Sequence, residues 1–406
     1  MRSQSRCAAG RVIQSGRMFS YRVPRPVEPN RLTKIVERFA QEGRSYVDLT
    51  VSNPTQVGLL YPRDQMMDAI AQAEIESYEP TSCGLYSARV AVATEYERLA
   101  IAVDPARIVL TSSSSESYGM LFRLLCNAGE SVLVPQPSYP LFESLGQLES
   151  IRIIPYPVRY ANGWCIDPEE VLRVTEPSTR ALVVVNPNNP TGSYVKRNEL
   201  EPLVNLCAYN KLALISDENF AEYAHGEDVT RVSSVLGTHS IIHFVLSGLS
   251  RLACLPQCKL AWVAYGGPPR DLKQLDWRME MMGRTYRSVS TIAQQGLPDL
   301  LRIGADLRDE LLNRIRQNLH HVRSQLHHSA AQLLSVEGGW YATLRLPRTR
   351  SGEDWALILM EKDGILTQPG FFFDFEDEAY LVLSLIVPEP QFQSAVTQLC
   401  ERVRLD

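Results

Sequence analysis

Features that mark membrane and nucleic-acid-binding proteins are missing from this 406-residue sequence. No apolar run approaches the roughly 18 residues of a membrane-spanning helix, so we expect no membrane partner. The formal net charge of −5 provides no overall positive field, so we expect no nucleic-acid partner. The phosphate-loop, GxGxxG and HExxH signatures are also absent. The eight cysteines are scattered and lack the clustering of a zinc site, so in a chain this long we expect reduced thiols and no metal.

Acidic residues are absent from the first 23 positions, which contain five arginines and several serines. This composition is typical of an organellar transit peptide. It is also typical of an extension upstream of an internal start at Met18. No apolar core of a secretory signal is present, and we expect a cytoplasmic protein with a flexible N-terminal extension at 1–23.

From about residue 31 to 285, short apolar runs alternate with helical patterns. Ala181–Asn186 and Ala213–Asp217 are predicted to be buried strands. Helices between such strands imply right-handed crossovers and a mostly parallel sheet covered on both faces. A long helical stretch over 291–332 and several α+β segments follow. We therefore predict an α/β protein with a large domain over 66–285 and a small domain built from 24–65 and 286–406.

Polar and aromatic residues follow the ends of several predicted strands. Asn189 lies in NPNNPTG after ALVVV, Asp217 ends ALISD, and Arg251 ends SGLSR. The carboxyl ends of parallel strands meet at one edge of a sheet, where ligands bind. The serine run after IVLT opens a helix and suits a phosphate group. The sequence therefore predicts one ligand site at this edge.

In order and spacing, these motifs resemble those of the class I/II aminotransferases, which are pyridoxal-phosphate enzymes of fold type I. The resemblance runs from about residue 18 to the end and implies that Asn189 donates to the phenolic oxygen of the cofactor. It also implies that Asp217 keeps the pyridine nitrogen protonated and that Tyr139 stacks on the ring. The remaining cofactor-binding positions that it implies are Ser112, Ser113, Ser114, Ser250, Lys259 and, reaching the neighbouring subunit of a homodimer, Tyr78.

Three positions depart from the family pattern. Arg251 stands where the family has the lysine that forms the internal Schiff base. A guanidinium stays charged, so it neither condenses with an aldehyde nor readily moves a proton. Phe220 replaces a tyrosine that usually bonds the phenolic oxygen. Near Val382 the family often has an arginine that binds the substrate carboxylate, so we expect either a different carboxylate-binding residue here or a substrate without a carboxylate.

Three interpretations follow from this combination. The first is the family reaction, amino-group transfer between an amino acid and a 2-oxo acid. The second is a repurposed site that holds pyridoxal or pyridoxamine phosphate without a covalent bond, with Arg251 anchoring a phosphate or carboxylate. The third is a non-catalytic pseudoenzyme with a binding or scaffold role. Retention of Asn189, Asp217 and Tyr139 favours a site that still binds the cofactor.

Overall fold

The computed structural model describes residues 19–24, 28–74, 76–327, 329–376 and 379–405, and the structural statements below concern these residues. Most of the predicted N-terminal extension, with Met18, lies outside them. No helix of the described segments is long and apolar enough to cross a membrane.

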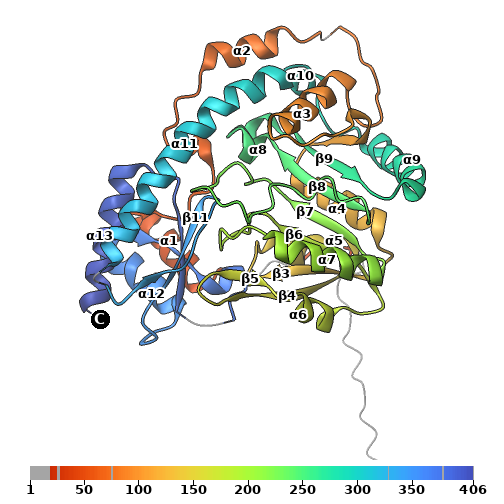
Figure 1. Ribbon diagram of the computed structural model, residues 1–406. Helices are drawn as coiled ribbons and strands as arrows, with labels where there is room; N and C mark the ends of the chain where they lie inside the picture. Colours follow the sequence, from red (N-terminus) through yellow and green to blue (C-terminus); the bar gives the residue numbers. More distant parts are fainter. Residues whose placement is uncertain (1–18, 25–27, 75, 328, 377–378, 406) are drawn as a thin grey trace, which may run out of the picture.

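An eight-stranded mixed sheet forms the centre of the molecule (Figure 1). The neighbouring strands β8, β7, β6, β3 and β4 run parallel, which confirms the predicted mostly parallel α/β architecture. Antiparallel pairs occur only toward the two edges of this sheet, at β8–β9, β9–β2 and β4–β5. In sheet order the strands are β2 (Ile108–Thr111), β9 (Ala261–Gly266), β8 (His243–Gly248), β7 (Ala213–Asp217), β6 (Thr179–Val185), β3 (Ser131–Gln136), β4 (Arg152–Tyr160) and β5 (Trp164–Ile166).

Helices cover both faces of this sheet. Successive residues of β6 point to opposite faces, so Val183 belongs to one apolar cluster and Val184 to the other. Apolar side chains from both clusters close the core, which explains why the central strands are continuous hydrophobic runs. The helices of this part are α3 (Tyr86–Arg98), α4 (Ser114–Leu125), α5 (Leu141–Glu149), α6 (Pro168–Val174), α7 (Arg197–Asn210), α8 (Leu249–Leu252) and α9 (Pro269–Tyr286).

A second, four-stranded sheet is built from the C-terminal part of the chain, in the order β10-β11-β14-β13. The N-terminal segment lies against it, because the backbone N–H of Ser384 in β14 donates to the carbonyl oxygen of Leu49 at 2.7 Å. In addition, β1 (Val47–Asp48) pairs in parallel with β12 (Ile365–Leu366) in a separate two-stranded sheet, and α1 (Arg31–Glu42) contacts α12 (Gly352–Ile358). The other elements here are β10 (Gln332–Leu333), β11 (Tyr341–Arg345), β13 (Gln368–Pro369), β14 (Tyr380–Ser384) and α13 (Glu389–Leu405).

The single helical stretch predicted over 291–332 is wrong in detail. The structure has two helices, α10 (Thr291–Gln295) and α11 (Leu297–Leu326), which are separated at Gly296. Pro298 lies in the first turn of α11, where its missing N–H costs nothing. The α11 helix contacts α2 (Arg63–Ala71). It also contacts α3 and α8 on the side of the central sheet and β10 and α13 on the side of the smaller sheet, and so connects the two sheets (Figure 1).

Candidate active site

The predicted site residues follow strands that share one edge of the central sheet. Asn189 follows β6, Asp217 ends β7, and Arg251 lies in α8 directly after β8. The strand register holds these ends level, since Val185 pairs with Asp217 and Asp217 pairs with Leu246. The serine turn follows β2, two positions away across β9.

The carboxylate of Asp217 is partly buried and held by three donors. The backbone N–H of Asn219 (3.1 Å) and its side-chain Nδ2 (2.7 Å) donate to Oδ1, and the hydroxyl of Tyr118 donates to Oδ2 (3.0 Å). Burial raises the pKa of Asp217 above its ordinary value, while these donors and the positive charge of Arg251 act in the opposite direction. A carboxylate offers about four lone-pair positions, so one acceptor position on Oδ2 remains for a further N–H donor.

The serine turn forms the N-terminus of α4. Ser113 is the N-cap, and its hydroxyl accepts from the backbone N–H of Glu116 at 3.2 Å. Both the N–H and the hydroxyl of Ser112 donate to Oε2 of Glu116, at 2.5 and 2.6 Å, so these two donors are already used. In the described segments the amides of Ser113, Ser114 and Ser115 have no backbone partner, as expected of a first helical turn, which suits an anion.

The loops that carry Tyr139 and Asn189 are joined to each other. Nδ2 of Asn188 donates to the carbonyl oxygen of Pro137 at 3.0 Å. The amide oxygen of Asn189 is buried and has no hydrogen-bond partner among the described residues. The Tyr139 side chain is 45% exposed, so its ring is accessible for stacking. The buried amide and the accessible ring thus lie on two loops that the bond between Asn188 and Pro137 joins.

Arg251 lies in an aromatic corner of this edge. Its Cζ is 4.7 Å from the ring centroid of Trp340 and 5.5 Å from that of Phe220, and its Nη1 donates to the carbonyl oxygen of Ser52 at 2.5 Å. The buried ring of Phe220 packs edge-on against Trp340, with centroids 5.3 Å apart, so Phe220 offers the site an apolar surface and no hydroxyl donor. Ser250 precedes Arg251 in α8 and is partly buried.

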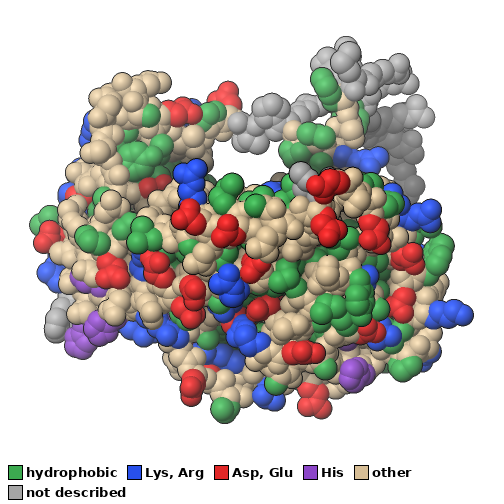
Figure 2. Space-filling model, turned by 90° about the horizontal axis from the view of Figure 1, so that it is seen from above, with side chains coloured by type: hydrophobic (Ala, Val, Ile, Leu, Met, Phe, Trp, Pro, Cys, Tyr) green, Lys and Arg blue, Asp and Glu red, His purple; other side chains and the backbone are tan. Residues whose placement is uncertain are grey.

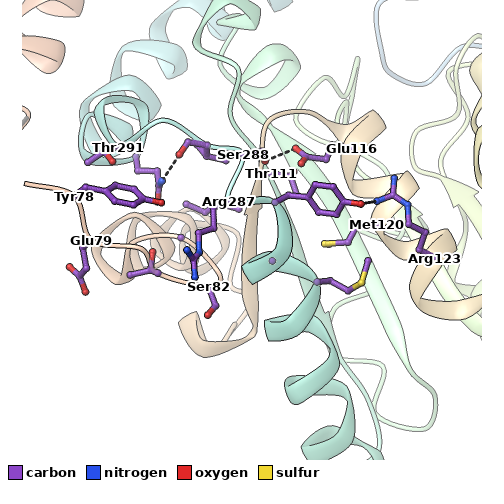
Figure 3. A pocket seen from close by; sticks show the side chains of 18 residues that line it. Tyr78, Glu79, Ser82, Thr111, Glu116, Met120, Arg123, Arg287, Ser288 and Thr291 are labelled. Atoms are coloured by element: carbon purple, nitrogen blue, oxygen red, sulfur yellow. Dashed lines mark hydrogen bonds between the residues drawn. The ribbon is translucent and has the colours of Figure 1, made fainter.

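Lys259 and Tyr78 are less closely tied to these residues. Lys259 is exposed and caps a short 3-10 helix, and the backbone bond from Leu249 N–H to Leu260 C=O (2.9 Å) keeps it near α8. Tyr78 is 67% exposed and lines a pocket beside the serine turn, on the wall opposite Glu116 (Figure 3). The hydroxyl of Ser288 donates to Glu116 across this pocket, at 2.8 Å (Figure 3).

Sequence reasoning missed two residues that hold Asp217. Asn219 donates to Asp217 and also, through Nδ2, to the hydroxyl of Ser114 at 2.9 Å, so it connects the acid to the serine turn. Tyr118 lies four residues after Ser114 on α4, and this spacing places both on one helix face. That spacing was the available signal for Tyr118. No local pattern indicates that Ser52 or Tyr341 lies near Arg251.

The sequence profile for "Aminotransferase class I and II" matches residues 45–399. The chain belongs to the class I and II aminotransferase family. The glutamate-pyruvate aminotransferase AlaA of Escherichia coli (strain K12) is 26% identical over 269 residues, which are 66% of this chain and 66% of that protein. The alanine aminotransferase of Mycobacterium bovis is 29% identical over 233 residues, 57% of this chain and 54% of that protein. The chain therefore matches just under two thirds of the length of the first relative and about half of the length of the second.

Solved structures of aminotransferases have the same fold, which confirms the fold type I prediction. An alanine aminotransferase from Pyrococcus furiosus superposes with a TM-score of 0.83 at 19% identity, covering 92% of this chain and 96% of that one. A double mutant of Thermus thermophilus aspartate aminotransferase gives 0.81 at 21% identity, covering 95% and 100%.

Membership of this family implies a pyridoxal-phosphate cofactor, and the residues present fit that group. Asp217 keeps one acceptor position for a ring N–H, and the side-chain amide nitrogen of Asn189 is the group that would donate to the phenolic oxygen. The first turn of α4 presents amides to a phosphate. Only position 251 lacks the chemistry that a covalent bond to the cofactor needs, because a guanidinium is not a nucleophilic amine.

Proposed function

We propose that this chain binds pyridoxal or pyridoxamine phosphate reversibly, without a covalent bond, and takes an amino acid or a 2-oxo acid as its second ligand. The observation that carries the proposal is the Asp217 carboxylate, which three donors hold so that one acceptor position remains. When bound, the cofactor withdraws electrons from the α-carbon of an amino acid through its protonated ring. An anionic Asp217 favours that protonated ring, since it accepts the ring N–H as a charge-assisted hydrogen bond.

The other residues divide the work of binding. The amides at the start of α4 hold the phosphate, the amide of Asn189 orients the ring, and Tyr139 stacks on one ring face. Asn219 fixes the position of Asp217 relative to the phosphate-binding turn, because its side chain donates hydrogen bonds to both Asp217 and Ser114. An arginine side chain at position 251 does not supply the proton transfer that the lysine performs in the family.

We further propose a homodimer, in agreement with the exposed apolar side chains on neighbouring helices. Figure 2 views the molecule from the side of α2 and α10 and shows patches of hydrophobic side chains on this face. Exposed side chains on α2, α3, α10 and α9 include Met67, Ile70, Tyr86, Val90, Ile292, Trp277, Met281 and Tyr286. Such surfaces mark interaction sites. Light scattering is expected to give twice the chain mass of 45.7 kDa, and a monomer mass at micromolar concentration would contradict the proposal.

A calorimetric titration with pyridoxamine phosphate tests the cofactor site. We expect the wild-type protein to bind it and to release it on gel filtration. Asp217→Asn is expected to weaken the affinity about 10- to 100-fold, because a hydrogen bond to a charged group contributes roughly 1.5–3 kcal/mol. The exposed Asp306 provides a matched control, and Asp306→Asn is expected to bind like the wild type. Equal binding by all three proteins would remove Asp217 from the site. No binding by the wild type would favour a scaffold role.

A further inference from the structure

The guanidinium of Arg251 is fixed in position, yet most of its donors are unused. The bond from Nη1 to the Ser52 carbonyl and the ring contact with Trp340, 4.7 Å from Cζ, fix its orientation. A guanidinium has five N–H donors, and this is the only side-chain hydrogen bond that Arg251 makes among the described residues. Fixed geometry with free donors is what a binding group requires.

No acidic side chain of the described residues forms an ion pair with Arg251. Asp217 is close enough for the charge of Arg251 to lower its pKa, but its oxygens already accept from Asn219 and Tyr118. Tyr341 is buried nearby, and the same positive charge opposes the effect of burial on its pKa. A partly buried cation among aromatic rings is normally paired, so the missing partner is expected to be an anionic ligand.

The planar fork of an arginine matches a carboxylate, which it binds through two parallel N–H···O bonds. A phosphate has its own set of donors at the start of α4, so Arg251 is left for a different anion. Val382, where the family often has an arginine, is buried in β14 and paired with Thr343 and Gln368, so it supplies no charge. We propose that Arg251 binds the carboxylate of the amino acid or 2-oxo acid ligand, which rests on the proposed function above.

The test compares two ligands and two variants by calorimetry on protein saturated with pyridoxamine phosphate. Pyruvate carries the carboxylate, and methyl pyruvate is its uncharged counterpart. Arg251→Gln is expected to weaken pyruvate binding at least tenfold, to leave methyl pyruvate unchanged, and to change the affinity for pyridoxamine phosphate less than twofold. Arg270→Gln, at an arginine whose side chain is 83% exposed, serves as the control and is expected to match the wild type.

The outcomes separate this inference from the proposed function. Equal pyruvate affinity in the wild type and Arg251→Gln, with cofactor binding intact, would overturn the role of Arg251. The absence of pyruvate binding to the loaded wild type would overturn it as well. If the wild type does not bind pyridoxamine phosphate, the proposed cofactor site is contradicted. The role of Arg251 is then tested by titrating pyruvate into cofactor-free wild type and Arg251→Gln. If the cofactor-free wild type binds pyruvate and Arg251→Gln does not, the role of Arg251 is supported. If both bind pyruvate equally, or if neither binds it, that role is contradicted.

Discussion

The Arg251→Lys variant is expected to attach pyridoxal phosphate covalently, and the wild-type protein is expected not to. The backbone at this position is held independently of the side chain, since the hydroxyl of Tyr223 donates to the carbonyl oxygen of Arg251 at 2.8 Å. The substitution therefore changes the functional group and leaves the start of α8 in place. An amine, unlike a guanidinium, loses its proton and condenses with an aldehyde.

The same variant is expected to gain amino-group exchange between alanine and 2-oxoglutarate. A positioned acid–base group contributes roughly 10²- to 10⁴-fold to a rate, so we expect a rise of at least about 100-fold in kcat. The KM is expected to stay high, because the substitution also removes the guanidinium that we assign to the carboxylate. A high kcat with a high KM would therefore agree with both proposals for position 251.

Mass spectrometry after borohydride reduction measures the covalent attachment. Arg251→Lys should gain the mass of one reduced cofactor per chain, and the wild type and Arg251→Gln should gain none at the same position. Attachment to the wild type through another lysine, such as Lys259, would contradict noncovalent binding. No gain in the variant, while pyridoxamine phosphate still binds, would mean that an amine at this position does not reach the cofactor.

The sequence was sufficient for the parts of the fold that depend on local pattern. The strands β6 and β7 are buried on both faces and appear as short runs of valine, leucine and isoleucine. The strands β4 and β5 were not predicted. Only part of β4 is buried, and it contains Pro155 and Pro157, which weaken a strand signal because proline lacks the backbone N–H. Its place beside β3 is fixed by tertiary pairing.

Some residues of the candidate site could also be predicted from local sequence motifs, whereas others are placed only by long-range contacts. Asn189 and Asp217 lie in motifs at strand ends, so the sequence predicts that they meet. The contacts that give them their chemistry join distant parts of the chain: Tyr118 reaches Asp217 across 99 residues, and Arg251 reaches Ser52 across 199. These contacts depend on how the helices and loops pack against the sheet edge. A sequence pattern of a few residues does not carry that information.

Glu218, the neighbour of Asp217 in the sequence, is a buried carboxyl group whose raised pKa makes the stability of the protein depend on pH. Its Oε1 accepts from the hydroxyl of Ser216 at 2.8 Å and from the backbone N–H of Val235 at 3.0 Å. The residue is 5% exposed, and burial raises its pKa from 4.5 to about 7, although its hydrogen-bond donors oppose the rise. The folded protein therefore binds this proton more tightly than the unfolded chain does.

Glu218→Gln is expected to gain stability over the wild type as the pH rises. A raised carboxyl pKa stabilises the folded state below about pH 4.5, and that contribution is lost as the pH rises through about 7. Glutamine keeps an acceptor oxygen for Ser216 and Val235 but has no charge to bury. The free energy of unfolding of the variant, relative to that of the wild type, should rise by about 3 kcal/mol between pH 4.5 and pH 8. Urea denaturation at both pH values measures this difference between variant and wild type. An equal difference at both pH values would show that Glu218 titrates normally.

As a control, Glu222→Gln removes the 2.6 Å ion pair with Arg98 and should not gain stability over this pH range.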